Sequence, residues 1–168
     1  MEQSEFIKKY SIGDSMPTDP TAKLIRARDF ARAVKEFVDE RFRAAAEVSV
    51  NVESPEPVLI CADYTAQFLK KLFTSIFGRV YLYIDIGERN GKMTFRITSD
   101  NPLPISKREM NTLIKAARNA GMTVLSVDGE ISAELDFVDE KQFSVYAASF
   151  ADGKTFMLKK FDKIFFGT

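Results

Sequence analysis

Asn90-Gly91 is the feature of this sequence that most restricts its fold. An Asn-Gly pair favours a two-residue type I′ turn, because that turn needs a positive φ angle at both central residues. When the flanking segments are folded about this turn, residues of like character fall opposite each other. The pairs are Ile86 with Phe95, Ile84 with Ile97 and, on the other face, Asp85 with Arg96. The sequence therefore predicts an antiparallel hairpin with one apolar face and a cross-strand ion pair.

Two helices are predicted on the N-terminal side of this hairpin, from apolar residues at helical spacing. The first is expected to begin at Pro20, after a cap at Asp19, and to run to Ala45. The second is expected to follow a cap at Asp63. Its apolar stripe consists of Ala66, Leu69, Leu72, Phe73 and Ile76. We therefore expect Phe73 in the main core.

A third helix is predicted after the hairpin. Ser106 and Glu109 have the spacing of a capping box at its start, and Gly121 suits the left-handed residue that follows its end. Strands are predicted around these helices from alternating or continuous apolar residues. Their ranges are 48–52, 58–62, 122–127 and 131–137, the last two joined by a turn at Asp128-Gly129.

The composition excludes several classes of site. The 168 residues include no histidine, so imidazole-based triads, histidine zinc sites and phosphotransfer through a histidine of this chain are excluded. The 24 Lys and Arg residues balance the 24 Asp and Glu residues, which argues against nucleic-acid binding through an excess of positive charge. We expect no metal site and no nucleic-acid partner.

The sequence also bears on location. Its apolar runs at 58–62 and 80–84 are far shorter than the ~20 residues of a membrane-spanning helix. Residues 1–5 place no basic flank before an apolar core, so no secretory signal is expected. The single cysteine, Cys61, lies in an apolar segment and is expected to be a buried, inert thiol. These features predict a cytoplasmic protein with no membrane span.

Several segments between about residues 20 and 138 have the order of a known fold. The loop at 99–105, Ser-Asp-Asn-Pro-Leu-Pro-Ile, resembles an Asp-x-Gly-x-Gly loop followed by an apolar residue. Residues 24–52 resemble a first helix and strand, 63–77 an Asn-bearing helix, and 120–124 the glycine before a closing hairpin. This order resembles the histidine kinase-like ATPase (GHKL, Bergerat fold) superfamily. The resemblance implies an α+β two-layer sandwich, with a mixed, largely antiparallel sheet and three helices on one face.

Departures from the family pattern fall on the parts that handle phosphate. The second helix lacks the Asn that holds Mg²⁺ in the family, Ser75 stands near that place, and no Glu lies beside it. Asp100 matches the family residue that binds the adenine amine. Pro102 and Pro104 replace the two glycines of the loop, and the lid is missing. The resemblance thus implies a vestigial nucleotide site of Asp100, Asn101 and Ser75, with no catalytic residue and no cofactor, ATP included.

Two groups of polar residues keep alternative interpretations. Asp100 and Asn101 either hold an adenine-like base or build a turn, because Asp-Asn-Pro is a good turn former. Lys70, Lys71 and Arg79 either hold an anion beside the second helix or form a solvated helix face.

We expect the chain to divide into a leader at 1–18 and, as the resemblance implies, a single histidine kinase-like ATPase domain at 19–168. The domain is expected to end in an extra hairpin at 139–168, turned at Asp152-Gly153, that extends the sheet. The alternative is an arm whose aromatic residues and lysines bind single-stranded nucleic acid or an anionic membrane surface. An aromatic element here is also a candidate to cover the nucleotide groove or to make a dimer contact.

The leading functional hypothesis is a non-catalytic relative of the histidine kinase ATPase domain, acting as a regulatory or protein-binding module in bacterial signalling. Its partner is expected to be a protein, and a second copy of the chain is one candidate. The alternative is a domain that still binds an adenine nucleotide, such as a minimal anti-sigma-type serine/threonine kinase. The missing Asn, glycines and lid argue against that alternative.

Overall fold

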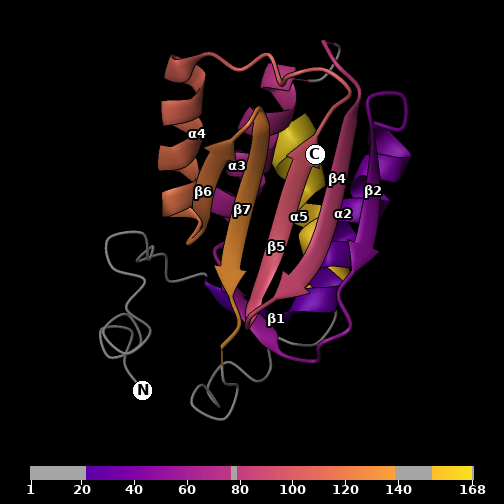
Figure 1. The fold of residues 1–168 in the computed structure, drawn as a ribbon. Helices are drawn as coiled ribbons and strands as arrows, with labels where there is room; N and C mark the ends of the chain where they lie inside the picture. Colours follow the sequence, from indigo (N-terminus) through magenta and orange to yellow (C-terminus); the bar gives the residue numbers. More distant parts are fainter. Residues whose placement is uncertain (1–21, 77–78, 139–152, 168) are drawn as a thin grey trace.

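The computed structural model describes residues 22–76, 79–138 and 153–167. A five-stranded sheet forms the centre of this part of the chain (Figure 1). Its strands are β2 (Ala46–Asn51), β4 (Leu82–Arg89), β5 (Lys92–Thr98), β6 (Thr123–Val127) and β7 (Glu130–Asp136). They lie in the order β2-β4-β5-β7-β6. Only the β2–β4 pair is parallel, so this sheet is mixed and largely antiparallel.

A second, two-stranded sheet and four helices complete the described residues. The small sheet pairs β1 (Lys23–Arg26) with β3 (Pro57–Ile60) in antiparallel fashion. The helices are α2 (Ala27–Arg41), α3 (Ala62–Ile76), α4 (Lys107–Asn119) and α5 (Gly153–Phe166), and none of these four is long and apolar enough to cross a membrane. They cover one face of the main sheet (Figure 1). The predicted α+β two-layer fold is confirmed, with one helix more than expected.

The predicted hairpin around Asn90-Gly91 is confirmed. β4 and β5 pair in the predicted register, with Ile86 opposite Phe95. The φ angle is 52° at Asn90 and 74° at Gly91, which is the left-handed region that a type I′ turn needs. The turn between β6 and β7 has the same geometry, with φ angles of 52° and 79° at its two central residues.

Alternate residues of the main sheet form an apolar face against the helices. Its buried residues on the three central strands are Leu82, Ile84, Ile86, Met93, Phe95, Ile97, Ile131, Ala133 and Leu135. Phe30 of α2 meets Phe95 edge-on, with 5.8 Å between the ring centroids. Phe73 of α3 is 1% exposed, which confirms its predicted place in the core.

The prediction of one long first helix is wrong at both ends. Residues 23–26 form β1, α2 begins only at Ala27, and α2 also ends earlier than expected. β1 is extended because its backbone pairs with β3 and because Leu24 and Ile25, on opposite faces, are both fully buried. The Ala27 N–H then donates to the carbonyl oxygen of Glu56 at 3.2 Å, which holds the start of α2 beside the small sheet.

The predicted C-terminal hairpin is wrong over residues 153–166, which form α5. Met157 and Phe161 lie one helical turn apart and are fully buried, because α5 packs against α2 and α3. Gly153 lies close to β1, since a Cβ atom added to it would be only 2.6 Å from Cγ2 of Ile25. This part of the tail therefore belongs to the folded core, as a helix rather than as added strands.

Polar contacts also join α5 to α2 and α3. They are the ion pairs Lys154–Glu36 (3.0 Å), Lys160–Asp63 (3.0 Å) and Arg41–Asp162 (3.4 Å), and the hydrogen bond from Lys70 Nζ to the Ile164 carbonyl oxygen (3.0 Å). Exposed ion pairs typically contribute about 0–1 kcal/mol each. The burial of Met157 and Phe161 therefore provides most of the attachment of α5.

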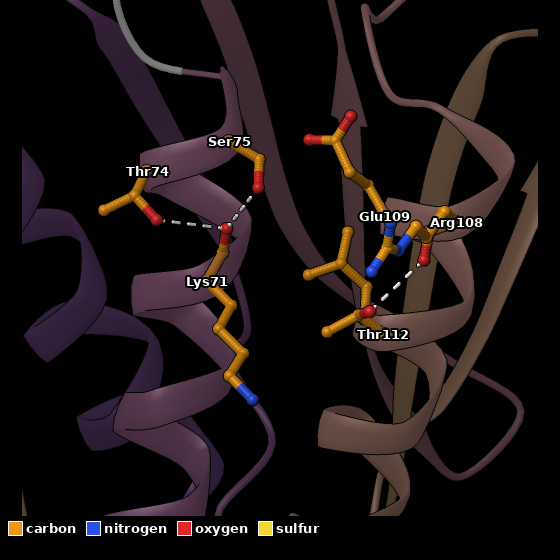
Figure 2. Close-up of a pocket in the computed structure, with 7 residues that line it drawn as sticks. Lys71, Thr74, Ser75, Arg108, Glu109 and Thr112 are labelled. Atoms are coloured by element: carbon orange, nitrogen blue, oxygen red, sulfur yellow. Dashed lines mark hydrogen bonds between the residues drawn. The ribbon is translucent and has the colours of Figure 1, made fainter.

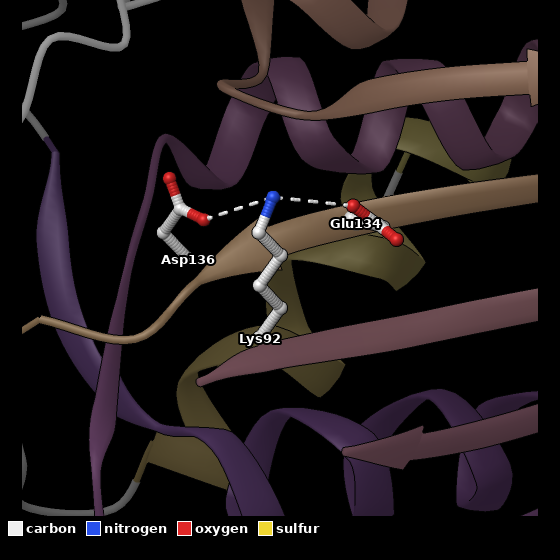
Figure 3. Close-up of polar contacts among 3 residues, drawn as sticks. All are labelled: Lys92, Glu134 and Asp136. Carbon is white, nitrogen blue, oxygen red and sulfur yellow. Dashed lines mark hydrogen bonds and ion pairs between the residues drawn. The ribbon is translucent and has the colours of Figure 1, made fainter. Parts of the chain in front are cut away.

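The other face of the main sheet is polar. Lys92 on β5 lies between Glu134 and Asp136 on β7, with Nζ at 3.4 Å and 3.7 Å from their carboxylate oxygens (Figure 3). The charge of Asp136, followed by the hydrogen bond and charge of Glu134, raises the pKa of Lys92. These contacts occur at the strand surface that no described helix covers.

The predicted ion pair between Asp85 and Arg96 is wrong about the main partner. Asp85 lies opposite Arg96 in the register of β4 and β5, as expected. The Arg96 guanidinium, however, makes two hydrogen bonds with the carboxylate of Glu130 on β7, at 2.8 Å and 3.0 Å. A bidentate contact of this kind is stronger than a single charge at a distance.

Three expectations fall outside the described residues. They concern the leader at 1–18, the helix cap at Asp19 and Pro20, and the part of the predicted hairpin at 139–152. The domain boundaries at 19 and 168 stay predictions for the same reason.

Phe161→Ala should lower the free energy of unfolding by about 3–5 kcal/mol, because it empties a fully buried aromatic site. The lost contacts include Phe37 of α2, whose ring centroid lies 5.2 Å away. Urea unfolding of the full chain measures the change. Phe166→Ala is the matched control, since this ring is 47% exposed and its removal should cost much less. Equal losses in the two variants would contradict the packing described for α5.

Candidate functional site

A surface cavity of about 250 Å³ lies between α3 and α4 (Figure 2). Its walls come from both helices. The lining residues are Lys71, Thr74 and Ser75 of α3 and Arg108, Glu109, Thr112 and Leu113 of α4. All but Leu113 are polar or charged, so this cavity is suited to binding a polar ligand.

Local signals in the sequence set both ends of α4, the helix that forms one wall of the cavity. The predicted capping box is confirmed: the Ser106 hydroxyl accepts from the Glu109 N–H at 3.1 Å, and Glu109 Oε1 accepts from the Ser106 N–H at 3.2 Å. The predicted end is confirmed too. Gly121 has a φ angle of 80°, and the Met122 N–H donates to the Ala117 carbonyl oxygen at 2.8 Å.

The three hydroxyl groups of the cavity are bonded within their own helices. Each donates to a carbonyl oxygen one turn earlier, at 2.7 Å for Thr74, 2.9 Å for Ser75 and 3.2 Å for Thr112. Figure 2 shows the bonds of Ser75 and Thr112, and also a longer contact, 3.4 Å, from Thr74 to the Lys71 carbonyl oxygen. A hydroxyl has a single proton to donate. These groups therefore present acceptor lone pairs to the cavity, which suits a ligand N–H better than a phosphate oxygen.

Charged groups face the cavity from both walls. Lys71 and Arg108 bring positive charge, and neither forms an ion pair with another described residue. Glu109 brings negative charge. Hydrogen bonds from Ser106 within the helix cap lower the pKa of the Glu109 carboxyl, and the nearby charge of Arg79 lowers it further. Glu109 is therefore a stable anion and a weak proton acceptor, which does not suit a general base.

This arrangement favours binding over chemistry. Two cations beside one carboxylate can hold a small polar ligand, but the cavity is smaller than the about 300–1,000 Å³ of a typical ligand pocket. The described part of the chain contains no group of three or more His, Cys, Asp or Glu side chains that could hold a metal ion.

The structure separates the predicted site residues. Ser75 lines the cavity, whereas Asp100 and Asn101 do not. Asp100 instead accepts a hydrogen bond from the Tyr83 hydroxyl at 3.3 Å. Tyr83 alternates with Leu82 and Ile84, which point into the core, so its ring lies on the open face of the sheet. The negative charge of Asp100 raises the pKa of Tyr83. Nucleotide contacts by these three residues stay a prediction.

The three basic residues considered at this helix also have different roles. Lys70 bonds to α5, and Arg79 Nη1 donates to the Pro104 carbonyl oxygen at 3.3 Å. Only Lys71 lines the cavity. α5 packs on α2 and α3 and contributes no lining residue, so this described part of the tail does not cover the cavity.

Arg108, Glu109 and Thr112 were not identified as site residues from the sequence. The capping box already gave Glu109 a structural role at the start of a helix. Nothing in the local sequence indicates that this first turn of α4 faces the last turn of α3.

Comparison with the sequence patterns of known families and with curated proteins finds no match. Comparison with solved structures finds histidine kinases. Acinetobacter baumannii histidine kinase AdeS is similar with a TM-score of 0.51 and 12% identity, over 80% of this chain and 74% of that chain. The cytoplasmic segment of histidine kinase QseC has a TM-score of 0.47 and 10% identity, over 80% of this chain and 84% of that chain. The catalytic domain of histidine kinase ThkA has a TM-score of 0.47 and 10% identity, over 69% of this chain and 95% of that chain.

The similarity to AdeS shows that this chain has the histidine kinase-like ATPase fold. At 12% identity the likeness concerns the fold alone.

Glu109 gives a prediction about stability at low pH. Because its folded pKa lies below the ordinary value of 4.5, its charge stabilises the fold above that value. This stabilisation is lost as the pH falls through the lowered folded pKa. Glu109→Gln should therefore reduce the acid-induced loss of stability, measured by urea unfolding at about pH 7 and about pH 3.

The control is Glu40→Gln on α2, an exposed glutamate with no hydrogen bond or ion pair to another described residue. Its acid response should match that of the original chain. If Glu109→Gln also leaves the acid response unchanged, the capping carboxylate does not carry the effect.

Proposed function

We propose that this chain is a non-catalytic domain with the histidine kinase-like ATPase fold, which acts as a regulatory or protein-binding module in bacterial signalling. The observation that carries the proposal is the position of Asp100. Its carboxylate bonds to Tyr83 on the open face of the sheet, while the cavity beside Ser75 lies between the helices on the other face. A nucleotide held as in the resembled family needs both places on one side.

The chemistry of the cavity supports the same proposal. Glu109 places a carboxylate beside Lys71 and Arg108, which opposes the binding of a triphosphate. The hydroxyl proton of Ser75 is already donated to its own helix, and a serine so bonded is a poor replacement for an Asn that holds Mg²⁺. Pro102 and Pro104 lack the backbone N–H groups with which a glycine-rich loop binds phosphate.

The alternative is a domain that still binds an adenine nucleotide, such as a minimal anti-sigma-type serine/threonine kinase. One observation favours it: Lys71 and Arg108 face one cavity and form no ion pair with a described residue. Two such cations attract a phosphate group. This alternative requires Glu109 to move or to be neutralised when the ligand enters.

We place the module in the cytoplasm and expect a protein partner, with a second copy of the chain as one candidate. The cytoplasmic assignment draws on Cys61, a buried cysteine that is the only one in the chain and so cannot form an internal disulfide.

Calorimetric titration with ATP and Mg²⁺ should show no binding tighter than about 1 mM, which corresponds to roughly −4 kcal/mol. The physical reason is that Asp100 lies outside the cavity and that the carboxylate of Glu109 lines it. A micromolar dissociation constant that is lost in Asp100→Ala would contradict the non-catalytic proposal and favour the alternative.

A second titration addresses the cavity directly. If the two cations bind phosphate, inorganic phosphate and ADP should shift backbone amide resonances in the first turn of α4, and Lys71→Gln should weaken this binding about tenfold. Lys115→Gln is the matched control, because Lys115 is an exposed α4 lysine outside the cavity. Unshifted resonances in the original chain would eliminate the adenine-nucleotide alternative.

A further inference from the structure

The two outer strands of the main sheet, β2 and β6, differ in how their edges are protected. β6 reads Thr-Val-Leu-Ser-Val, with no charged residue and no proline. Proteins usually protect an exposed edge with charges, proline, bulges or a covering segment, because unpaired backbone groups attract another strand. β6 lies at one side of the sheet in Figure 1 and β2 at the other.

The turn that follows β6 decides which of its backbone groups point outward. Val127 and Glu130 flank a two-residue turn and therefore form a hydrogen-bonded pair. Pairing alternates along an antiparallel ladder, so the backbone groups of Val124 and Ser126 point away from β7. Neither residue has a backbone hydrogen bond to any other described residue on that side.

The opposite edge is occupied. On β2, the Val48 carbonyl oxygen accepts a hydrogen bond from Lys35 Nζ of α2 at 2.9 Å. β2 also carries the exposed, charged Glu47. A strand that approached this edge would have to displace the lysine and meet the carboxylate.

Apolar side chains accompany the unprotected edge. Leu125 is 54% exposed on the open face of the sheet. Met110 and Ile114 of α4 are only partly buried and pack against the core. At the edge itself, the exposed apolar side chain of Leu125 accompanies the row of unpaired backbone groups.

We infer that β6 pairs with β6 of a second copy of this chain, antiparallel and about a twofold axis at Leu125. In this register Val124 lies opposite Ser126 of the other copy, so the outward groups of both residues bond in pairs. Leu125 lies opposite its own counterpart at a non-hydrogen-bonded position, where side chains approach most closely. The proposal rests on the role as a protein-binding module and names the surface that serves it.

Two observations favour a second copy over another partner. In a twofold contact, each β6 residue faces a residue of β6 in the other copy. Because β6 has no charged residue, no like charges face each other in this contact. Once the two β6 strands have paired, the outer edges that the described strands leave in the joined sheet are the two β2 strands, each protected by Lys35 and Glu47. Assembly therefore stops at two copies rather than continuing into a filament.

The strength of this contact is limited by the length of the strand. A five-residue strand with its neighbouring side chains buries an area toward the low end of specific interfaces, about 1,200 Å² or less in total. The dimer should therefore form reversibly as the protein concentration rises.

Analytical ultracentrifugation from about 10 μM to about 1 mM tests the proposal. The mass of the original chain should rise toward twice that of a single chain, and Leu125→Lys should abolish the rise, since it sets two positive charges at the twofold axis. Ser126→Asp is a second exposed variant with the same expected loss. Ser49→Lys on β2 is the matched control and should still dimerise.

A constant single-chain mass at about 1 mM would overturn the inference, and so would a Leu125→Lys variant that dimerises as the original chain does. Hydrogen exchange adds a residue-level readout. The amides of Val124 and Ser126 should exchange more slowly as the concentration rises, whereas that of Leu125 is already bonded to β7. Slow exchange of both amides at every concentration would show that another part of the same chain covers the edge, which also overturns the inference.

These measurements use no nucleotide. A chain that stays single would contradict the dimer but would not bear on the ATP titrations. Tight ATP binding would contradict the non-catalytic proposal but would not bear on the dimer.

Discussion

Burial of one face of the five-stranded sheet is the constraint on which the rest of this structure depends. Strand residues alternate between faces, and the apolar set that includes Ile84 and Phe95 all falls on one side. The opposite side carries ion pairs such as that of Arg96 with Glu130. Helices can therefore stabilise the sheet from one side only, at about 25 cal/mol for each Å² of apolar surface buried. All four described helices lie there, including α5, which joins α2 to α3.

The candidate site follows from this crowding of helices on one face. Side chains that point away from the sheet meet where neighbouring helices pack, and those that line the cavity between α3 and α4 are mostly polar. Glu109 has two roles there, because its carboxylate completes the cap of α4 and also faces Lys71 and Arg108 across the cavity. A group that stabilises the helix in this way limits what the cavity can bind. The carboxylate that opposes triphosphate binding in our proposal thus also stabilises the start of α4.

The same arrangement leaves the two sheet edges unlike. α2 lies beside β2, so its Lys35 reaches a carbonyl oxygen at that edge. α4 lies beside β6, but its charged residues line the cavity or the helix surface, and the edge of β6 has no such contact with a described residue. An interaction surface at β6 would be separate from the cavity, so binding of a partner and the fate of the nucleotide site need not be linked.

The sequence by itself determined the features whose causes are local. The register about Asn90-Gly91, the capping box at Ser106 and the left-handed Gly121 depend on residues a few positions apart, and the structure has all three. Tertiary contacts decided the rest. Residues 23–26 are a strand because β3 offers backbone partners, and 153–166 are a helix because its side with Phe161 is buried against α2 and α3. Asp100 faces the open side because Tyr83, distant in the sequence, binds it there. No local pattern contains these partners, because they are brought together only when the sheet has been covered.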